Sequence, residues 1–395
     1  MSTVLQRARF ATSVIFLVHG LLIATWISRI PSVQQALGLS SGVLGMALLA
    51  IALGSLISMP FTGGLVARYG SARPTLAGTI ALALSLPLIA AASNLWVLGA
   101  AMLFYGAAAG AMDVAMNAQA VTVERFYGRP VMSSFHGLFS IGGMVGAALG
   151  GAIAAAGVSV TAHFAASMLV YSVIGALAAR WQIAADSEET TSSAPSFQLP
   201  TRPVFAIGLV AFCILLCEGA IADWTAIYLR DYMQAGPALA AAGYAVFSGT
   251  MAIGRLSGDW LTDRLGPERI VRWGSLLAAL GLTLALLAPR LELALCGFGA
   301  VGLGLAAIIP NVFGAGGRAE GMSAGAGIAA VTTTGYFGFL IGPPLIGWVA
   351  EATALRISLF LLVVLCVAAS ALAGAVRPRP NQQLHPAPAV SGGSR

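Results

Sequence analysis

Two acidic residues, Asp113 and Glu218, lie near the middle of long apolar segments, where a charged side chain is costly. A carboxylate at the centre of a membrane helix costs about 2.5–3.5 kcal/mol on an insertion scale, so an ionisable residue at that depth indicates a function. Burial disfavours the ionised form of a carboxyl group, which lets it bind and release a proton near neutral pH. We therefore predict that Asp113 and Glu218 carry protons. The alternative for Asp113 is a carboxylic acid that stays hydrogen-bonded to a neighbouring helix.

Further polar residues accompany Asp113 on its segment. In a helix, Asp113, Asn117, Val121 and Glu124 form one narrow stripe, and the rise per residue puts Asp113 about 5 Å from mid-span, with Glu124 at the cytoplasmic mouth. Polar residues that could hydrogen-bond a solute occur at depth in other segments too. The candidate solute-binding residues are His19, Trp26, Asn117, Gln119, His136, Asn311 and Tyr336.

The histidines and the tryptophan each have a second interpretation. A lone histidine in a membrane helix is more often a hydrogen-bonding partner for another helix than a proton relay, and this applies to His19 and His136. Trp26 could stack on a sugar ring, or it could occupy the aromatic belt at the membrane interface, which is the favoured interpretation.

Asp223 and Arg230 belong to the same segment as Glu218 but to another face of it. Asp223 lies about 140° around a helix from Glu218, whereas Asp223 and Arg230 are two turns apart on one face. We therefore predict that Asp223 and Arg230 form an ion pair at an outer gate, in preference to a substrate-binding role for Asp223.

The elements that must position these residues are membrane helices. The chain is 58% hydrophobic and 9% charged, with a mean hydropathy of +0.89, whereas soluble domains are about 25% charged. A bilayer core needs about 20 apolar residues per helix. The sequence therefore predicts an all-α membrane protein with twelve transmembrane helices, near residues 10–30, 42–66, 74–93, 96–123, 131–156, 160–180, 203–229, 238–262, 270–288, 292–316, 322–350 and 355–376.

The arginines predict the orientation of these helices. All twenty basic residues are arginines, and placing the N-terminus inside leaves fifteen on the cytoplasmic side, four outside and Arg255 within a span. By the positive-inside rule both termini are cytoplasmic. The net charge of +6 then reflects topology and indicates no nucleic-acid partner. We expect a multi-pass protein of the bacterial inner membrane whose first span is retained as an anchor.

Two motifs recur in the chain at one fixed spacing. Leu65–Gly70 matches Leu261–Gly266, and a pair of glycines four residues apart, at 142 and 146, recurs at 338 and 342, so both motifs have an offset of 196 residues. This indicates a tandem duplication, and duplicated halves of a membrane protein usually face each other across a substrate path. We predict a six-helix half over residues 1–181, a cytoplasmic linker over 182–202, a second six-helix half over 203–376 and a disordered tail over 377–395.

The distribution of polar residues predicts which helices face the path. Spans three, six, nine and twelve have no ionisable residue near their centres, so we expect them to be a lipid-facing scaffold and the others to line a cavity.

Other classes of function are disfavoured. No GxxxxGK[ST] or HExxH motif occurs, which argues against ATP-driven transport and against an intramembrane enzyme. Cys213 and Cys217 share a helical face without the further ligands that a metal site needs. We therefore predict no enzymatic activity, no cofactor and no metal. A non-transporting sensor would need an appended signalling region, which the short linker and tail do not provide.

The repeated loops resemble those of a known family. GLVARYG and DWLTDRLG are similar to the signature loop of the major facilitator superfamily, G-x-L-a-D-r-x-G-r, and residues 111–143 and 335–347 look like its MosC-like branch, which is distantly similar to fucose:proton symporters. The resemblance covers about residues 10–376. It implies a central cavity lined by spans one, four, seven and ten that rocks between inward-facing and outward-facing states.

The resemblance also implies a cytoplasmic gate after span eight. In the family, the acid and the arginines of this loop clasp neighbouring helix ends, and Asp263, Arg264 and Arg269 match that pattern.

The first copy of the loop departs from the family pattern. Ala67 replaces the acid, which leaves Arg68 and Arg73 without it. Either this gate is weaker, or Glu124, which is followed by Arg125 at the end of span four, supplies the missing charge. We count all four charged residues among the candidate gating residues.

These features together predict a secondary active transporter, working as a monomer, that moves a small polar solute with protons across the lipid bilayer. A sugar, a polyol or an amino-polyol suits the family and the polar residues at mid-depth. The alternative is a proton-coupled exporter of amphipathic compounds, which would have a more apolar and aromatic cavity. Pro343, after Gly342, resembles the antiporter motif of drug exporters, but span five has no such proline.

Overall fold

The computed structural model describes residues 3–183, 201–319 and 322–377, and the described chain is helical with no strand. Most of the predicted linker, residues 184–200, and most of the predicted tail, residues 378–395, lie outside the described residues. The helices are α1 (Thr3–Ile27), α2 (Ile30–Ala36), α3 (Ser41–Tyr69), α4 (Ala72–Ala90), α5 (Leu95–Tyr127), α6 (Met132–Ala155), α7 (Val160–Ala179), α8 (Arg202–Asp231), α9 (Pro237–Leu265), α10 (Pro267–Leu287), α11 (Leu291–Leu305), α12 (Ile308–Gly317), α13 (Ala324–Ala352), α14 (Leu355–Ala371) and the short 3-10 helix η1 (Leu372–Val376).

Twelve stretches of helix in the described chain are long and apolar enough to cross a membrane, which confirms the predicted number. Two of these spans are interrupted. The first continues from α1 into α2, with Pro31 in the first turn of α2, where a proline needs no backbone donor. The tenth divides into α11 and α12 at Ala306 and Ala307, and the Asn311 amide donates to the Ala307 carbonyl oxygen at 2.8 Å.

The repeated loops end their helices in the same way. Gly70 ends α3 and Gly266 ends α9, with φ angles of 71° and 80°. A residue with a β-carbon rarely adopts this conformation, so each copy of the motif needs its glycine.

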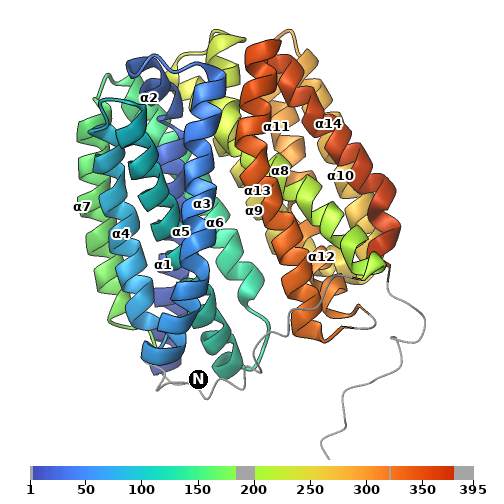
Figure 1. Ribbon diagram of the computed structural model, residues 1–395. Helices are drawn as coiled ribbons and strands as arrows, with labels where there is room; N and C mark the ends of the chain where they lie inside the picture. The colour runs from blue at the N-terminus through green and yellow to red at the C-terminus, as the bar shows by residue number, and fades with distance from the viewer. Residues whose placement is uncertain (1–2, 184–200, 320–321, 378–395) are drawn as a thin grey trace, which may run out of the picture.

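The helices form two groups that lie side by side, α1–α7 and α8–α14 (Figure 1). The groups meet mainly where α6 packs on α9 and α3 packs on α13. We call the end of the bundle that carries Thr3, Tyr69, Tyr127 and Leu265 the termini end, and the other end, where α1 leads into α2, the opposite end.

The repeated glycines make equivalent contacts in the two groups. A β-carbon at Gly142 of α6 would collide with the Leu17 carbonyl oxygen of α1, and one at Gly338 of α13 would lie 2.5 Å from the Phe212 carbonyl oxygen of α8. Small residues at such crossings let two helix backbones approach closely. The duplicated motif is therefore a packing contact between the first and fifth spans of each group.

Candidate solute-binding cavity

A cavity of about 360 Å³ lies between the two groups of helices. Its walls come from α1, α3, α5 and α6 on one side and from α8, α9 and α13 on the other. No residue of α4, α7, α10 or α14 lines it, which agrees with the prediction that spans three, six, nine and twelve are scaffold. The ionisable or hydroxyl-bearing residues and the tryptophan in its lining are His19, Trp26, Ser55, Tyr105, Asp113, Ser140, Glu218, Asp223, Tyr244, Ser248, Arg255 and Tyr336.

The expected set of lining helices needs one correction. Spans one, four and seven line the cavity as the resemblance implied, but no residue of α11 or α12, which form span ten, is in the lining. Helices α3, α6, α9 and α13 contribute instead. The close packing of α6 on α9 and of α3 on α13 brings these four helices to the centre, whereas α11 packs against α9 and α10.

Asp113 points into the cavity from α5 and keeps one partner on its own helix. The Asn117 amide donates to Asp113 Oδ1 at 3.1 Å and to the Asp113 backbone oxygen at 2.8 Å. Asn117 itself is outside the lining. Its amide therefore holds the Asp113 carboxyl group in place and does not contact a solute in the cavity. The alternative prediction for Asp113 was a hydrogen bond to a neighbouring helix, and no such bond occurs among the described residues.

Glu218 lies opposite an arginine that sequence reasoning did not assign to the site. Arg255 Nη2 of α9 is 3.8 Å from Glu218 Oε2 of α8, and Arg255 Nη1 donates to Ser140 Oγ of α6 at 2.9 Å. The two charged side chains are only 18% and 16% exposed. Arg255 therefore connects a cavity carboxylate to the helix of the other group. The signal was available, because Arg255 is the one arginine left within a predicted span.

Asp223 also lines the cavity, and the predicted Asp223–Arg230 pair does not form. Arg230 instead makes an ion pair with Asp231, with Nε 2.5 Å from Oδ1. Two turns of helix separate Asp223 from Arg230 by about 10 Å, whereas Asp231 is its neighbour in sequence. Asp223 thus adds a third carboxyl group to the cavity.

Several buried polar atoms at the cavity have no hydrogen-bond partner among the described residues. These are both ring nitrogens of His19, Trp26 Nε1 and Tyr105 Oη. Trp26 is 2% exposed and its ring centroid lies 6.3 Å from that of Tyr105. The favoured interpretation of Trp26 as an interfacial residue is therefore wrong, because α1 packs inside the bundle and directs this side chain to its centre.

Gln119, His136 and Asn311 do not line the cavity, although all three are candidate solute-binding residues. With its amide oriented to satisfy both partners, Gln119 donates to Ser71 Oγ at 2.6 Å and accepts from the Ile183 backbone nitrogen at 2.8 Å. The Asn311 amide donates to Thr262 Oγ1 of α9 at 2.9 Å. These two amides therefore join structural elements at the termini end.

His136 is also a packing residue. Its ring stands edge-on to Phe16 of α1, with centroids 5.3 Å apart, one helical turn before Ser140. Tyr336 and His19, in contrast, lie in the lining as predicted.

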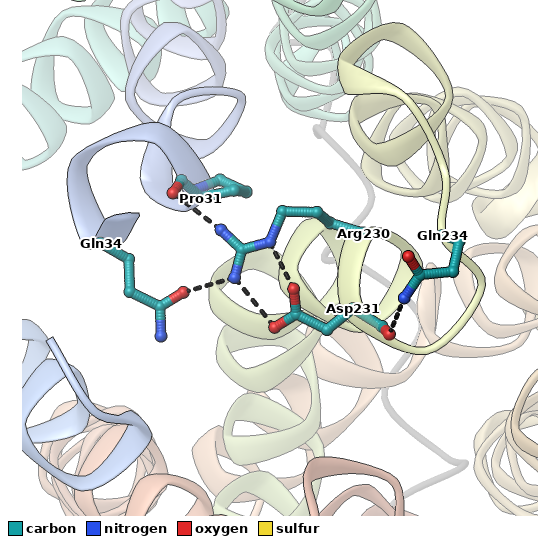
Figure 2. A network of polar contacts seen from close by, with 5 residues as sticks. All are labelled: Pro31, Gln34, Arg230, Asp231 and Gln234. Atoms are coloured by element: carbon teal, nitrogen blue, oxygen red, sulfur yellow. Dashed lines mark hydrogen bonds and ion pairs between the residues drawn. The ribbon is translucent and has the colours of Figure 1, made fainter. Parts of the chain in front are cut away.

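Two bridges join the groups at the opposite end. In the Arg230 bridge, Arg230 of α8 donates to the Pro31 carbonyl oxygen at 2.8 Å and to Gln34 Oε1 at 2.9 Å, while Asp231 holds the other edge of the guanidinium (Figure 2). The Gln234 side chain in turn donates to the Asp231 backbone oxygen at 2.7 Å.

In the Glu351 bridge, Glu351 Oε2 of α13 accepts from Ser40 Oγ and from the Gly42 backbone nitrogen, both at 2.6 Å. This places a carboxylate at the N-terminus of α3, where unpaired backbone donors and the helix dipole favour a negative charge. Both bridges cross from one group of helices to the other.

At the termini end, the gating residues of the first loop have different partners from those expected. Glu124 does not supply a charge to Arg68 or Arg73, because its Oε2 accepts from the backbone nitrogens of Val131 and Met132 at 2.7 and 2.8 Å. It caps the start of α6. The Arg68 guanidinium lies 5.2 Å from the ring centroid of the adjacent tyrosine, and Arg125 stands in the last turn of α5.

The second loop is not clasped in the described part of the chain. Arg264 stacks on Trp260, with its guanidinium carbon 4.2 Å from the ring centroid, while Asp263 and Arg269 make no hydrogen bond or ion pair to a described residue. A hydrogen bond joins the groups at this end instead: Ser133 of α6 donates to Asp259 Oδ2 of α9 at 2.7 Å.

Comparison with known proteins agrees with this geometry. The sequence pattern of the Major Facilitator Superfamily matches residues 11–324. The chain is 38% identical over 366 residues to an uncharacterised MFS-type transporter of Yersinia pestis, covering 92% of this chain and 94% of the relative. It is 32% identical over 360 residues to the membrane protein MosC of Rhizobium meliloti, covering 90% and 87%. The crystal structure of the E. coli fucose:proton symporter FucP superposes with a TM-score of 0.62 at 17% identity, covering 96% of this chain and all of that one.

Proposed function

The chain belongs to the Major Facilitator Superfamily, and we propose that it is a proton-coupled secondary transporter for a small hydroxyl-bearing solute such as a sugar, a polyol or an amino-polyol. The observation that carries this proposal is the central cavity, in which the carboxyl groups of Asp113, Glu218 and Asp223 line one space between the two groups of helices. We place the protein in the bacterial inner membrane, where a proton gradient is available.

Proton coupling is supported by the position of Glu218. When Glu218 is ionised, it attracts Arg255 at 3.8 Å, and when it binds a proton that attraction disappears. Arg255 also holds Ser140 on α6, so the charge on Glu218 acts on the contact between α6 and α9. Asp113, at the same cavity but in the other group, provides a second place where a proton can bind as the solute moves.

A hydroxyl-bearing solute is supported by the unpartnered polar atoms of His19, Trp26 and Tyr105. Buried donors and acceptors are almost always hydrogen-bonded in folded proteins, and hydroxyl groups of a solute can both donate and accept. The side chains of His19, Trp26 and Tyr105 are 5%, 2% and 2% exposed, so they must shift for a solute in the cavity to reach these atoms. The amides of Gln119 and Asn311 lie outside the cavity lining and so do not contact a solute there.

Alternating access is supported by the way in which the opposite end is held. The Arg230 and Glu351 bridges and the packing of α3 on α13 join the groups there. For the cavity to open at this end, both bridges must break and the groups must move apart where α3 packs on α13. In the outward-open state the contact of Ser133 with Asp259 would hold the termini end closed.

The experiment is uptake into proteoliposomes with an imposed pH gradient, screened with a panel of hexoses, hexitols and aminohexitols. We expect at least one compound to accumulate when the outside is acidic and not when the gradient is collapsed. Tyr105→Phe should weaken the apparent affinity for this compound. Phe104→Leu should not, because Phe104 is 41% exposed and lies outside the cavity lining. Accumulation that persists without a gradient would contradict proton coupling.

A second candidate function is export of amphipathic compounds, and one observation favours it. The cavity is also lined by the rings of Phe139, Phe247 and Phe339 in addition to its tyrosines and tryptophan, which suits an apolar ligand. The same vesicles distinguish the two functions. An exporter would expel a lipophilic fluorescent cation in exchange for protons, and none of the hydroxylated compounds would accumulate.

A further inference from the structure

A second cavity, of about 590 Å³, lies at the termini end, outside the region between the two groups. Its charged lining consists of three arginines, Arg269, Arg272 and Arg377, and one acid, Glu268, so the site carries an excess of two positive charges when all four are ionised. Trp273 forms part of the same wall. We call these five residues the arginine pocket.

The ion pairs of the arginine pocket leave one arginine available. Glu268 pairs with Arg272 Nη2 at 2.9 Å and with Arg377 Nε at 2.5 Å, which fixes both guanidinium groups around one carboxylate. Arg269, which directly follows Glu268 in the first turn of α10, makes no hydrogen bond or ion pair to any residue in the described ranges. The pocket thus presents an unneutralised arginine beside two anchored ones.

An apolar stripe rises from the pocket along α10. Trp273, Leu277, Leu280, Leu284 and Leu287 are all exposed and follow each other at intervals of four and three residues, which puts them on one face of the helix. Trp273 is 62% exposed and Leu280 68% exposed. Arg269 is four residues before Trp273, at the foot of the same stripe. This helix crosses the membrane as the ninth span, so the stripe faces lipid chains.

We propose that the arginine pocket binds the phosphate headgroup of an anionic phospholipid, whose acyl chain lies along the α10 stripe. The excess positive charge suits a phosphodiester that carries a net negative charge, and basic pockets at the ends of membrane helices are suited to such headgroups. A soluble phosphate would use the arginines but would gain nothing from Trp273 and the leucines. The occupant is therefore a lipid and not a free anion.

The test is lipid binding to the purified full-length protein in a neutral detergent, measured by native mass spectrometry. Phosphatidylglycerol should bind more tightly than phosphatidylcholine with the same acyl chains, and added salt should weaken only the former. Arg269→Gln should weaken phosphatidylglycerol binding about fivefold, because one arginine near an anionic lipid contributes about 1 kcal/mol. The matched control is Arg290→Gln, an exposed arginine at the opposite end, which should have no effect.

A second pair of variants tests the stripe. Trp273→Ala should weaken phosphatidylglycerol binding, whereas Trp96→Ala, which removes an 86% exposed tryptophan at the opposite end, should not. Equal binding of the two lipids, or equal effects of Arg269→Gln and Arg290→Gln, would overturn the proposal. Displacement of the lipid by millimolar inorganic phosphate would show a site for a soluble anion and would overturn it as well. The salt dependence of the unmodified protein decides the matter if a variant fails to fold.

Discussion

Removing the Arg230 side chain should shift the protein toward a state that is open at the opposite end. Arg230 donates two hydrogen bonds to α2 in the other group of helices, to the Pro31 carbonyl oxygen at 2.8 Å and to Gln34 Oε1 at 2.9 Å. A hydrogen bond to a charged group contributes about 1.5–3 kcal/mol, but the side chain is 28% exposed, so solvent screening reduces each to about 1 kcal/mol. Arg230→Ala should therefore cost the closed state about 2 kcal/mol, or about thirtyfold in the ratio of open to closed molecules.

The assay is thiol labelling of the cavity from the opposite end. Ala52 lines the cavity, so Ala52→Cys in a protein whose four native cysteines are replaced by serine reports access to it. A membrane-impermeant maleimide added on that side should react faster with Arg230→Ala by a factor approaching thirty. Asp231→Asn should give a smaller increase, since it loosens the guanidinium without removing its bonds to α2. Arg290→Ala, at the same end, is the control and should react at the parent rate.

A labelling rate for Arg230→Ala within twofold of the parent protein would refute the reasoning. It would mean that the Arg230 bridge does not hold the closed state, and that packing of α3 on α13 alone keeps the opposite end shut.

Three further predictions concern packing, the assignment of polar residues and the second bridge. Gly142→Val should lower the melting temperature in detergent by several degrees, because overpacking against the α1 backbone costs about 1–3 kcal/mol. Gly99→Val, where the β-carbon meets no atom within 4 Å, should leave it unchanged. Gln119→Ala should lower the melting temperature without changing the KM for the solute, whereas Tyr105→Phe should raise that KM with little effect on melting. Glu351→Gln should also speed thiol labelling from the opposite end, and unchanged labelling would remove this residue from the gate.

The elements of the fold were predictable from sequence because the membrane imposes them. Each span must bury about 20 residues and satisfy its own backbone hydrogen bonds, so hydropathy alone predicts twelve helices, and the repeated glycines predict the equivalent crossings at Gly142 and Gly338. The break between α11 and α12 was not predicted, although Pro310 marks it. A proline ring clashes with the carbonyl group four residues earlier, which here belongs to Ala306, and so interrupts the helix at that point.

The candidate site was only partly predictable, because depth in the membrane can be read from sequence but the direction in which a helix face points cannot. Asp113, Glu218, His19 and Tyr336 lie in the cavity as predicted. Gln119 is on the same helix as Asp113, and Asn311 is on α12, but their side chains turn toward Ser71 and Thr262 at the termini end. That direction depends on how the helices within each group pack, which is a tertiary property.

Arg255 shows where one additional step of reasoning was possible. An arginine within a span needs a partner, and Glu218 is one of few acids at comparable depth, so the pair could have been proposed from the sequence. Tyr105 and Tyr244 carried no such signal, because a tyrosine in a membrane helix is as common at the interface as in a cavity.

The central claim is that the cavity carboxyl groups couple movement of the solute to movement of protons. The most direct test compares two transport modes in proteoliposomes for whichever compound the uptake screen identifies. In Glu218→Gln, exchange of solute between the two sides should continue at equal concentrations, while accumulation driven by a pH gradient should be lost. Loss of both modes in Asp113→Asn would be consistent with a role in the transport cycle itself. Full gradient-driven accumulation in both Glu218→Gln and Asp113→Asn would contradict the claim.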